Sequence, residues 1–206
     1  MSGPGPFQDK PSLRVESLTL TRGERTLLRD FSFAAGPGAF VEIRGGNGAG
    51  KTTLLRAIAG FLQPRAGRIV FDGVEEPSLA LHHVGHLNGL KGGASVLAHL
   101  RYWAGLFGVA PRDQEALTRL GLRMQAELPA RVLSQGQARR LALSRLVVAP
   151  RPVWLLDEPA AGLDAEGRDV LAALIDAHRA EGGIVIAAVH EALGPAPSQT
   201  ITVGAP

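Results

Sequence analysis

The fold of this chain is decided by one stretch of its sequence, which reads Gly45-Gly46-Asn47-Gly48-Ala49-Gly50-Lys51-Thr52. It matches the pattern G-x-x-x-x-G-K-[ST], in which glycines let successive backbone N–H groups close around phosphate oxygens. In such a loop the lysine, here Lys51, reaches the β- and γ-phosphates, and the hydroxyl of Thr52 can bind Mg²⁺. The following helix, which includes Thr53, directs its positive N-terminus at the anion. The stretch therefore predicts a site for a nucleoside triphosphate and Mg²⁺, against the alternative of a glycine-rich turn.

The segments around this stretch predict alternating strands and helices. The largely apolar residues Phe40–Ile43 form a strand before it, and the apolar spacing after it indicates a helix that Pro64 stops. Short apolar strands are also predicted at Val153–Leu156 and Ile184–Val189, with a helix over Ala165–Ala180 between them. Strands of this kind are buried on both faces, because helices cover a parallel sheet from either side. The sequence thus predicts an α/β fold on a parallel sheet.

Changes in composition suggest the domain organisation. Residues 1–12 are rich in glycine and proline and are expected to form a disordered tail, and residues 13–206 are predicted to form a single nucleotide-binding domain. Within it, residues 13–87 and 150–206 are assigned to an α/β core, and residues 88–149 to an inserted helical subdomain. The helical patterns of this insertion span residues 94–107, 111–122 and 134–149. Ser134 is suited to cap the third of these helices.

Length and composition exclude several classes of protein. The chain has 206 residues and a mass of 21.6 kDa, enough for one domain with its own core. With 45% hydrophobic residues it is too apolar for wholesale disorder, and without cysteine it has no disulfide or thiolate metal site. We expect no signal peptide, because the N-terminus has no apolar h-region, and no membrane span, because no apolar run approaches roughly 18 residues. The net charge of +3 is weak, and we expect no nucleic-acid partner.

A pair of carboxylates ends the strand predicted over Val153–Leu156. Asp157 and Glu158 follow its last residue, at the carboxyl edge of the sheet, where open α/β sheets bind ligands. Asp157 can hold the metal, directly or through water, and Glu158 can polarise or deprotonate a water that attacks the γ-phosphate. The alternative is an acidic helix start before Pro159. Together with the glycine-rich stretch, the pair predicts a P-loop nucleoside triphosphatase.

Three further segments resemble the ATP-binding cassette (ABC) ATPases. The run Leu133-Ser134-Gln135-Gly136-Gln137 is similar to their signature sequence, with Gln135 at a position where the family usually has glycine. Residues Ala161-Gly162-Leu163-Asp164 resemble the D-loop of the family, and His190, which follows a predicted strand, resembles its switch histidine. The order and spacing of these motifs around the P-loop, residues 45–52, identify the chain as a member of this family.

This resemblance implies a head-to-tail dimer of ATPase subunits. Each ATP would lie between the P-loop of one subunit and the signature helix of the other. Ser134, Gly136 and Gln137 would bind the γ-phosphate across the interface, because the N-terminus of their helix attracts an anion. Asp164 would contact the partner subunit, and His190 would act in catalysis by holding the γ-phosphate and helping to place the water.

Residues 85–91, with the sequence GHLNGLK, resemble more narrowly the ABC ATPases that serve haem export in cytochrome c biogenesis. This resemblance implies an ATP-hydrolysing subunit bound to integral membrane subunits at the cytoplasmic face of the inner membrane. The alternatives are the nucleotide-binding subunit of another ABC transporter and a soluble, non-transport ABC ATPase. We expect a membrane subunit to dock on the loop over residues 87–93 and on part of the apolar face of the following helix.

The sequence departs from these families at three places. Leu87 stands where most ABC ATPases have a glutamine that contacts Mg²⁺ and the attacking water. The neighbouring Asn88 could take over through its amide oxygen, although its reach is shorter, and the sequence does not decide whether it does. Arg22 lies near the position of the aromatic residue that usually stacks on adenine, and it can either stack or remain solvated. Ala98 and His99 replace the Glu-Asn pair of the haem-export group.

Three histidines, His82, His83 and His86, form a cluster that resembles a metal or haem site in sequence. Strand alternation, however, places His82 and His83 on opposite faces of their strand. We therefore expect this cluster to be a strand and the loop that follows it, with no bound metal or haem.

Overall fold

The computed structural model describes residues 7, 10–74 and 76–204. The predicted parallel sheet has five strands in the order β5-β6-β7-β3-β8, and every neighbouring pair is parallel. Its strands are β5 (Leu81–Val84), β6 (Val153–Asp157), β7 (Ile184–Ala188), β3 (Phe40–Arg44) and β8 (Gln199–Thr202). Every residue of β6 and β7 is buried, because both faces of this sheet are covered. The predicted α/β fold on a parallel sheet is thereby confirmed.

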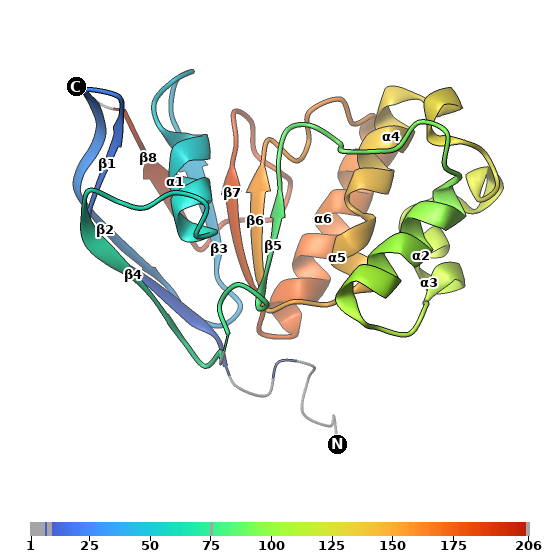
Figure 1. Cartoon of the computed structure of the whole chain (residues 1–206), viewed down its shortest axis with the longest axis horizontal. Coiled ribbons are helices and arrows are strands. Elements are labelled where there is room, and N and C mark those ends of the chain that lie inside the picture. Colours follow the sequence, from blue (N-terminus) through green and yellow to red (C-terminus); the bar gives the residue numbers. More distant parts are fainter. Residues whose placement is uncertain (1–6, 8–9, 75, 205–206) are drawn as a thin grey trace.

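A second sheet is antiparallel and has three strands in the order β2-β1-β4. Its strands are β1 (Ser12–Arg22), β2 (Arg25–Ala35) and β4 (Ala66–Asp72). Figure 1 places this sheet on one side of the molecule, with helix α1 (Lys51–Ile58) between it and the parallel sheet. Of the expected N-terminal tail, residues 1–6 and 8–9 lie outside the described residues, and Ser12 belongs to β1.

Helix α1 directly follows the P-loop and fills the space between the two sheets. Leu54, Leu55 and Ile58 are almost completely buried against apolar residues of both sheets. The helix ends before Pro64, contrary to the prediction, because the chain leaves it through Gly60 in the left-handed conformation (φ 78°). This packing holds the N-terminus of α1 at the carboxyl edge of the parallel sheet.

Helices cover the other face of the parallel sheet. Helix α6 (Ala165–Ala180) packs on β7, and the remaining helices extend this side of the molecule outward (Figure 1). They are α2 (Val96–Phe107), α3 (Asp113–Arg119), α4 (Gln135–Ala142) and α5 (Ser144–Val148), with the short 3₁₀ helices η1 (Arg123–Gln125) and η2 (Ala130–Val132). In the part of the chain that the structure describes, none of these helices is long and apolar enough to cross a membrane.

Two of these helices differ from their predicted bounds. The single helix predicted over residues 134–149 is divided into α4 and α5. The division falls at Leu143, whose ψ angle departs from that of an ideal α-helix (φ −77°, ψ −8°). The helix predicted over 111–122 is limited to α3, because the chain turns away through Gly121 (φ 64°). Ser134 caps α4 as predicted, and its Oγ accepts the backbone N–H of Gln137 at 3.2 Å.

Candidate active site

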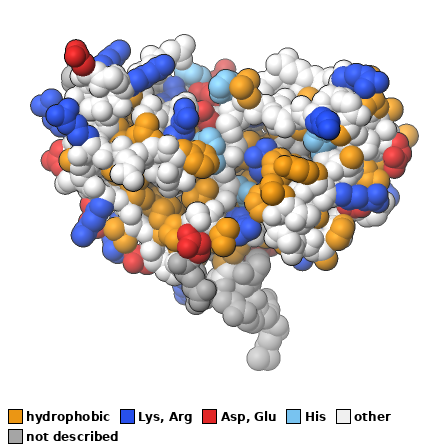
Figure 2. Space-filling view, in the orientation of Figure 1, with side chains coloured by type: hydrophobic (Ala, Val, Ile, Leu, Met, Phe, Trp, Pro, Cys, Tyr) orange, Lys and Arg blue, Asp and Glu red, His pale blue; other side chains and the backbone are white. Residues whose placement is uncertain are grey.

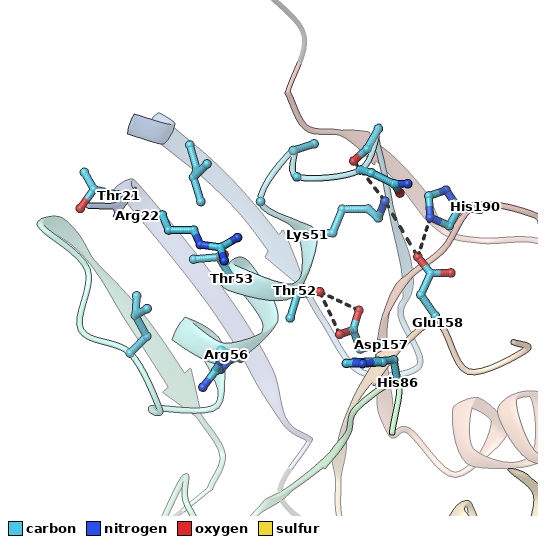
Figure 3. A pocket seen from close by; sticks show the side chains of 17 residues that line it. Thr21, Arg22, Lys51, Thr52, Thr53, Arg56, His86, Asp157, Glu158 and His190 are labelled. Carbon is cyan, nitrogen blue, oxygen red and sulfur yellow. Dashed lines mark hydrogen bonds and ion pairs between the residues drawn. The ribbon is translucent and has the colours of Figure 1, made fainter. Parts of the chain in front are cut away.

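A cavity of about 590 Å³ opens where the parallel sheet meets the N-terminus of α1 (Figure 3). Its volume lies in the range of small-molecule sites. The P-loop forms one wall, and residues at the ends of β6 and β7 face that wall. The lining residues are Thr21, Arg22, Leu27, residues 46–53, Arg56, Leu62, His86, Asp157, Glu158 and His190.

Two glycines shape the P-loop. Gly45 has φ 151°, and a side chain at this position would collide with the carbonyl of Val203. Gly50 has φ 104°, which lets the loop turn directly into α1 at Lys51. The Nζ of Lys51 donates to the carbonyl oxygens of Gly45 (2.7 Å) and Gly46 (3.4 Å). The lysine is only 7% exposed, so its charge is held against the loop that is predicted to surround the phosphates.

Thr52 and Asp157 form the second feature of the site. The Oγ1 of Thr52, in the first turn of α1, lies 2.9 Å and 3.1 Å from the two carboxylate oxygens of Asp157. Asp157 ends β6 and is only 3% exposed, so its carboxylate is fixed in place. Hydroxyl and carboxylate oxygens are hard ligands of the kind that Mg²⁺ binds. The two residues therefore fit the predicted metal.

Glu158 is the third feature. Its backbone is left-handed (φ 50°), which is uncommon outside glycine and recurs at functional sites. Its N–H donates to the carbonyl of Ala188 at 3.0 Å, which ties it to the end of β7. Its Oε1 lies 3.1 Å from Nε2 of His190 and 3.9 Å from Nζ of Lys51. Three predicted site residues from distant parts of the sequence thus meet at one carboxylate.

The other predicted nucleotide-binding residues form a separate group outside the cavity. Ser134 and Gln137 make a capping box on α4, in which Oε1 of Gln137 also accepts the N–H of Ser134 at 3.0 Å. Asp164 caps α6 by accepting the N–H of Gly167 at 2.8 Å. Gly136 is buried beside this carboxylate, since a Cβ on it would lie 3.4 Å from Asp164. The role of this group in ATP binding stays a prediction.

The end of the cavity away from Asp157 is formed by Thr21, Arg22 and Leu27 of the antiparallel sheet and by Arg56 of α1 (Figure 3). None of the described lining residues is a phenylalanine, tyrosine or tryptophan. A base bound at this end would therefore lie beside guanidinium groups. This arrangement favours the stacking alternative for Arg22.

Arg139 of α4 belongs to the surroundings of the site although the sequence motifs did not predict it, and its side chain is only 1% exposed. Its guanidinium donates to backbone carbonyls of two separate segments. In residues 85–88 it contacts Gly85 O (2.9 Å), His86 O (3.4 Å) and Asn88 Oδ1 (3.2 Å). At the end of β6 it contacts Asp157 O (3.2 Å), Glu158 O (2.7 Å) and Pro159 O (3.0 Å).

Arg139 is therefore a buried cation held mainly by carbonyl oxygens. Burial lowers the pKa of this guanidinium, and the charges of Asp157 and Glu158 oppose that effect. One signal in the sequence marks its position. Arg139 lies three residues after Gly136 and four before Leu143, and this helical spacing puts the three residues on one face. In the structure all three residues are buried.

The three clustered histidines have different surroundings. His82 is buried, packs edge-on against Phe107, and lies 2.6 Å from the carbonyl of Ala149 through Nε2. Burial lowers the pKa of His82 to about 4. His83 packs against Phe61, on the opposite face of β5, as strand alternation predicts. Among the described residues no group of three His, Cys, Asp or Glu side chains could hold a metal ion.

His86 is the second residue whose place in the site the sequence did not predict, because the family resemblance points to positions 87 and 88 of this loop. The side chain of Leu87 is 75% exposed, and the Asn88 amide is bonded to Arg139. Neither residue lines the cavity, whereas His86 does. The alternative that Asn88 takes over from the missing glutamine therefore finds no support in the position of its side chain.

Comparisons with known proteins relate this fold and site to a family. A model of the ABC transporter family matches residues 28–161, more than half of the chain. The chain is 46% identical over 208 residues to the cytochrome c biogenesis ATP-binding export protein CcmA of Maricaulis maris (strain MCS10), covering 97% of each protein. It is 45% identical over 186 residues to the protein of the same name from Rhodopseudomonas palustris (strain HaA2), covering 88% of this chain and 93% of that protein.

A solved structure agrees at the level of the fold. A putative ABC transporter ATP-binding protein from Pyrococcus furiosus superposes with a TM-score of 0.82 at 23% identity, covering 93% of this chain and 97% of that one. The fold and the site together define an ATP-binding protein of the ABC transporter family. Within that family, the chain belongs with the cytochrome c biogenesis ATP-binding export proteins named CcmA.

Proposed function

We propose that this chain is the ATP-hydrolysing subunit of a membrane export complex of cytochrome c biogenesis, with haem as the exported group. One observation carries the catalytic part: Lys51, Thr52, Asp157, Glu158 and His190 meet at the phosphate end of one cavity. The export role is supported by the names of the relatives, which are ATP-binding export proteins of cytochrome c biogenesis. Haem is inferred from the resemblance of residues 85–91.

Binding of ATP uses the P-loop and the N-terminus of α1. Backbone N–H groups of the loop and the helix dipole attract the phosphates, and the buried Lys51 adds a full charge. Thr52 and Asp157 would hold Mg²⁺, which neutralises charge on the phosphate oxygens when it is bound. Arg22 and Arg56 line the opposite end, where the base would lie.

Hydrolysis needs a base beside the terminal phosphate. Glu158 lies at the phosphate end of the cavity, and its carboxylate can accept a proton from the attacking water. Nε2 of His190 lies 3.1 Å from Oε1 of this carboxylate, and its imidazole would hold an oxygen of the γ-phosphate. The contact of the Glu158 N–H with β7 keeps the left-handed residue in place during this step.

A second copy of the chain completes the proposed site. Ser134 and Asp164 are exposed at the N-termini of α4 and α6, away from the cavity of their own chain. A helix N-terminus provides free N–H groups for an anion, and Ser134, Gly136 and Gln137 form such an end. In a head-to-tail dimer this end would meet the γ-phosphate bound by the other subunit.

The membrane subunits are proposed to dock beside α2. A second cavity, of about 460 Å³, lies between this helix and the loop before it, and is lined by Gly89, Lys91, Ala94, Ala98, His99, Tyr102 and Trp103. Tyr102 (60% exposed) and Leu106 (57% exposed) add apolar surface, and Figure 2 shows hydrophobic side chains on this face of the molecule. This side would face the cytoplasmic surface of the inner membrane.

Glu158→Gln tests the catalytic part of the proposal. The variant should bind ATP with affinity close to wild type but release phosphate at least about 10²-fold more slowly, since a general base is lost. Glu191→Gln is the matched control, because Glu191 is 76% exposed and pairs with the exposed Arg168. Turnover close to wild type in Glu158→Gln would exclude Glu158 from the chemistry.

A cellular assay tests the export part. In a bacterium that lacks its own haem-exporter ATPase, this chain should restore the maturation of c-type cytochromes when its membrane subunits are supplied. Glu158→Gln should fail to restore maturation, although it accumulates to the same level. Active ATPase that restores no maturation would separate the hydrolysis from the proposed export.

A further inference from the structure

The loop that follows β5 reaches the nucleotide cavity through one side chain. Of residues 85–93, all of which the structure describes, His86 alone lines that cavity. Leu87 is directed to solvent, and Asn88 is bonded to Arg139. Figure 3 shows the imidazole of His86 at the end of the cavity that Asp157 also lines, and it draws no hydrogen bond from the ring to the other lining residues. The ring is therefore available to a ligand in the cavity.

We infer that His86 binds an oxygen of the terminal phosphate of ATP, and that Arg139 is the residue that positions it. The inference deepens the proposed function and rests on it, because it assumes that the cavity binds ATP. It assigns to His86 the contact between the nucleotide and the loop that leads to the proposed docking site of the membrane subunit.

The position of His86 within the cavity identifies the part of the nucleotide it contacts. Its neighbours at this end are Thr52, Asp157 and Glu158, which surround the expected site of the metal and the γ-phosphate. The base would lie at the far end, beside Arg22. An imidazole N–H is a suitable donor to an anionic oxygen, and hydrogen bonds to charged acceptors are stronger than neutral ones.

Arg139 sets the distance between His86 and the catalytic carboxylate. One nitrogen, Nη1, holds the carbonyls of Gly85 (2.9 Å) and His86 (3.4 Å), and Nη2 holds the carbonyl of Glu158 (2.7 Å). The guanidinium is planar and rigid, so its two ends cannot move independently. A shift of α4, which carries Arg139, is therefore transmitted to His86 and to Glu158 together.

The inference is tested by NMR of the histidine side chains, with the imido analogue of ATP and with ADP as probes. The chain has 6 histidines, and the signals of His86 and His190 are assigned from the spectra of His86→Gln and His190→Gln. The ATP analogue should shift the His86 signal, whereas ADP, which lacks the terminal phosphate, should leave it near its free position. Equal shifts with both nucleotides, or no shift with either, would overturn the inference.

Calorimetry on the same samples separates failure of this inference from failure of the proposed function. If the ATP analogue does not bind at all, both are wrong. If it binds and the His86 signal does not move, only the role of His86 is wrong. His86→Ala should weaken binding of the ATP analogue about tenfold relative to ADP, the effect of losing one hydrogen bond to a charged group. Leu87→Ala is the matched control and should leave both affinities unchanged, because its side chain is 75% exposed.

The positioning role of Arg139 has its own readout. Arg139→Lys keeps the charge but loses the planar guanidinium with its several N–H donors. It should therefore abolish the shift of the His86 NMR signal with the ATP analogue, while the affinity for ADP stays the same. A His86 shift of full size in this variant would refute the positioning role. If Arg139→Lys does not fold, Asn88→Ala gives the answer, since it removes one acceptor from the same guanidinium and should reduce the His86 shift without changing ADP affinity.

Discussion

Replacing Arg139 with methionine should destabilise the whole domain strongly. The substitution keeps a long apolar stem within α4 but removes the guanidinium that donates to six oxygen atoms. Five of these oxygens are backbone carbonyls of residues 85–86 and 157–159. Buried acceptors that lose their donor pay the cost of desolvation without a partner.

The size of the effect follows from the geometry. Five of the six contacts are 3.2 Å or shorter, and each contributes on the order of 1 kcal/mol. Because the variant no longer buries a cation, part of this loss is offset by the desolvation cost that is recovered. The free energy of unfolding should therefore fall by about 3–4 kcal/mol. For a domain of this size the midpoint of thermal unfolding should fall by roughly 10 °C.

Urea unfolding followed by circular dichroism, without nucleotide, measures this change. Arg168→Met is the control, because Arg168 is exposed and pairs with Glu191, which is 76% exposed. An exposed pair of this kind contributes at most about 1 kcal/mol. A loss below about 1 kcal/mol in Arg139→Met, equal to that of the control, would refute the reasoning that these carbonyls depend on the guanidinium.

Three further outcomes are expected. Lys51→Ala should weaken ATP binding about 10–100-fold in a fluorescence titration, since it removes a charged hydrogen-bond donor from the phosphates. An unchanged affinity would mean that residues 45–52 form a turn that does not bind the phosphates. Ser134→Arg should leave binding by the monomer intact but abolish ATP-dependent dimerisation in light scattering, and a dimer of wild-type strength would contradict the shared site. His82, with its pKa lowered to about 4 by burial, is neutral when folded. Because the unfolded chain binds this proton below about pH 6.5, the free energy of unfolding should decrease from pH 6.5 to 4. His82→Gln should flatten that decrease in urea titrations; an unchanged slope would show that another group is responsible.

The sequence alone was sufficient to predict the parts of the site that depend on residues adjacent to one another in the chain. The P-loop is a contiguous motif, and its glycines and lysine have one main use. Asp157 and Glu158 follow a strand whose apolar residues require burial, so their place at the sheet edge was predictable. The cap of α4 was predictable for the same reason, because Ser134 bonds to a residue only three positions away.

The ends of the helices were less predictable from the sequence. A helix can end at any of several neighbouring residues, because most residue types can adopt the backbone angles that end it. Pro64 marks a place where α1 could not continue, but the helix had already ended through Gly60. Leu143 carries no sequence signal for a break, and yet its backbone divides α4 from α5. In both cases the helix ends where the backbone angles change, at a place that the sequence pattern did not mark.

The tertiary structure alone decided which side chain of the loop after β5 lines the cavity. Leu87 and Asn88 were the candidates by resemblance, but the backbone of this loop is held by Arg139, which lies 54 residues from Gly85 in sequence. Those hydrogen bonds turn Asn88 inward and leave His86 in the cavity. The contact between Thr52 and Asp157, 105 residues apart, likewise exists only because the sheet joins distant strands. Periodicity indicates which residues are buried, whereas the direction of a loop side chain depends on hydrogen bonds from remote parts of the chain.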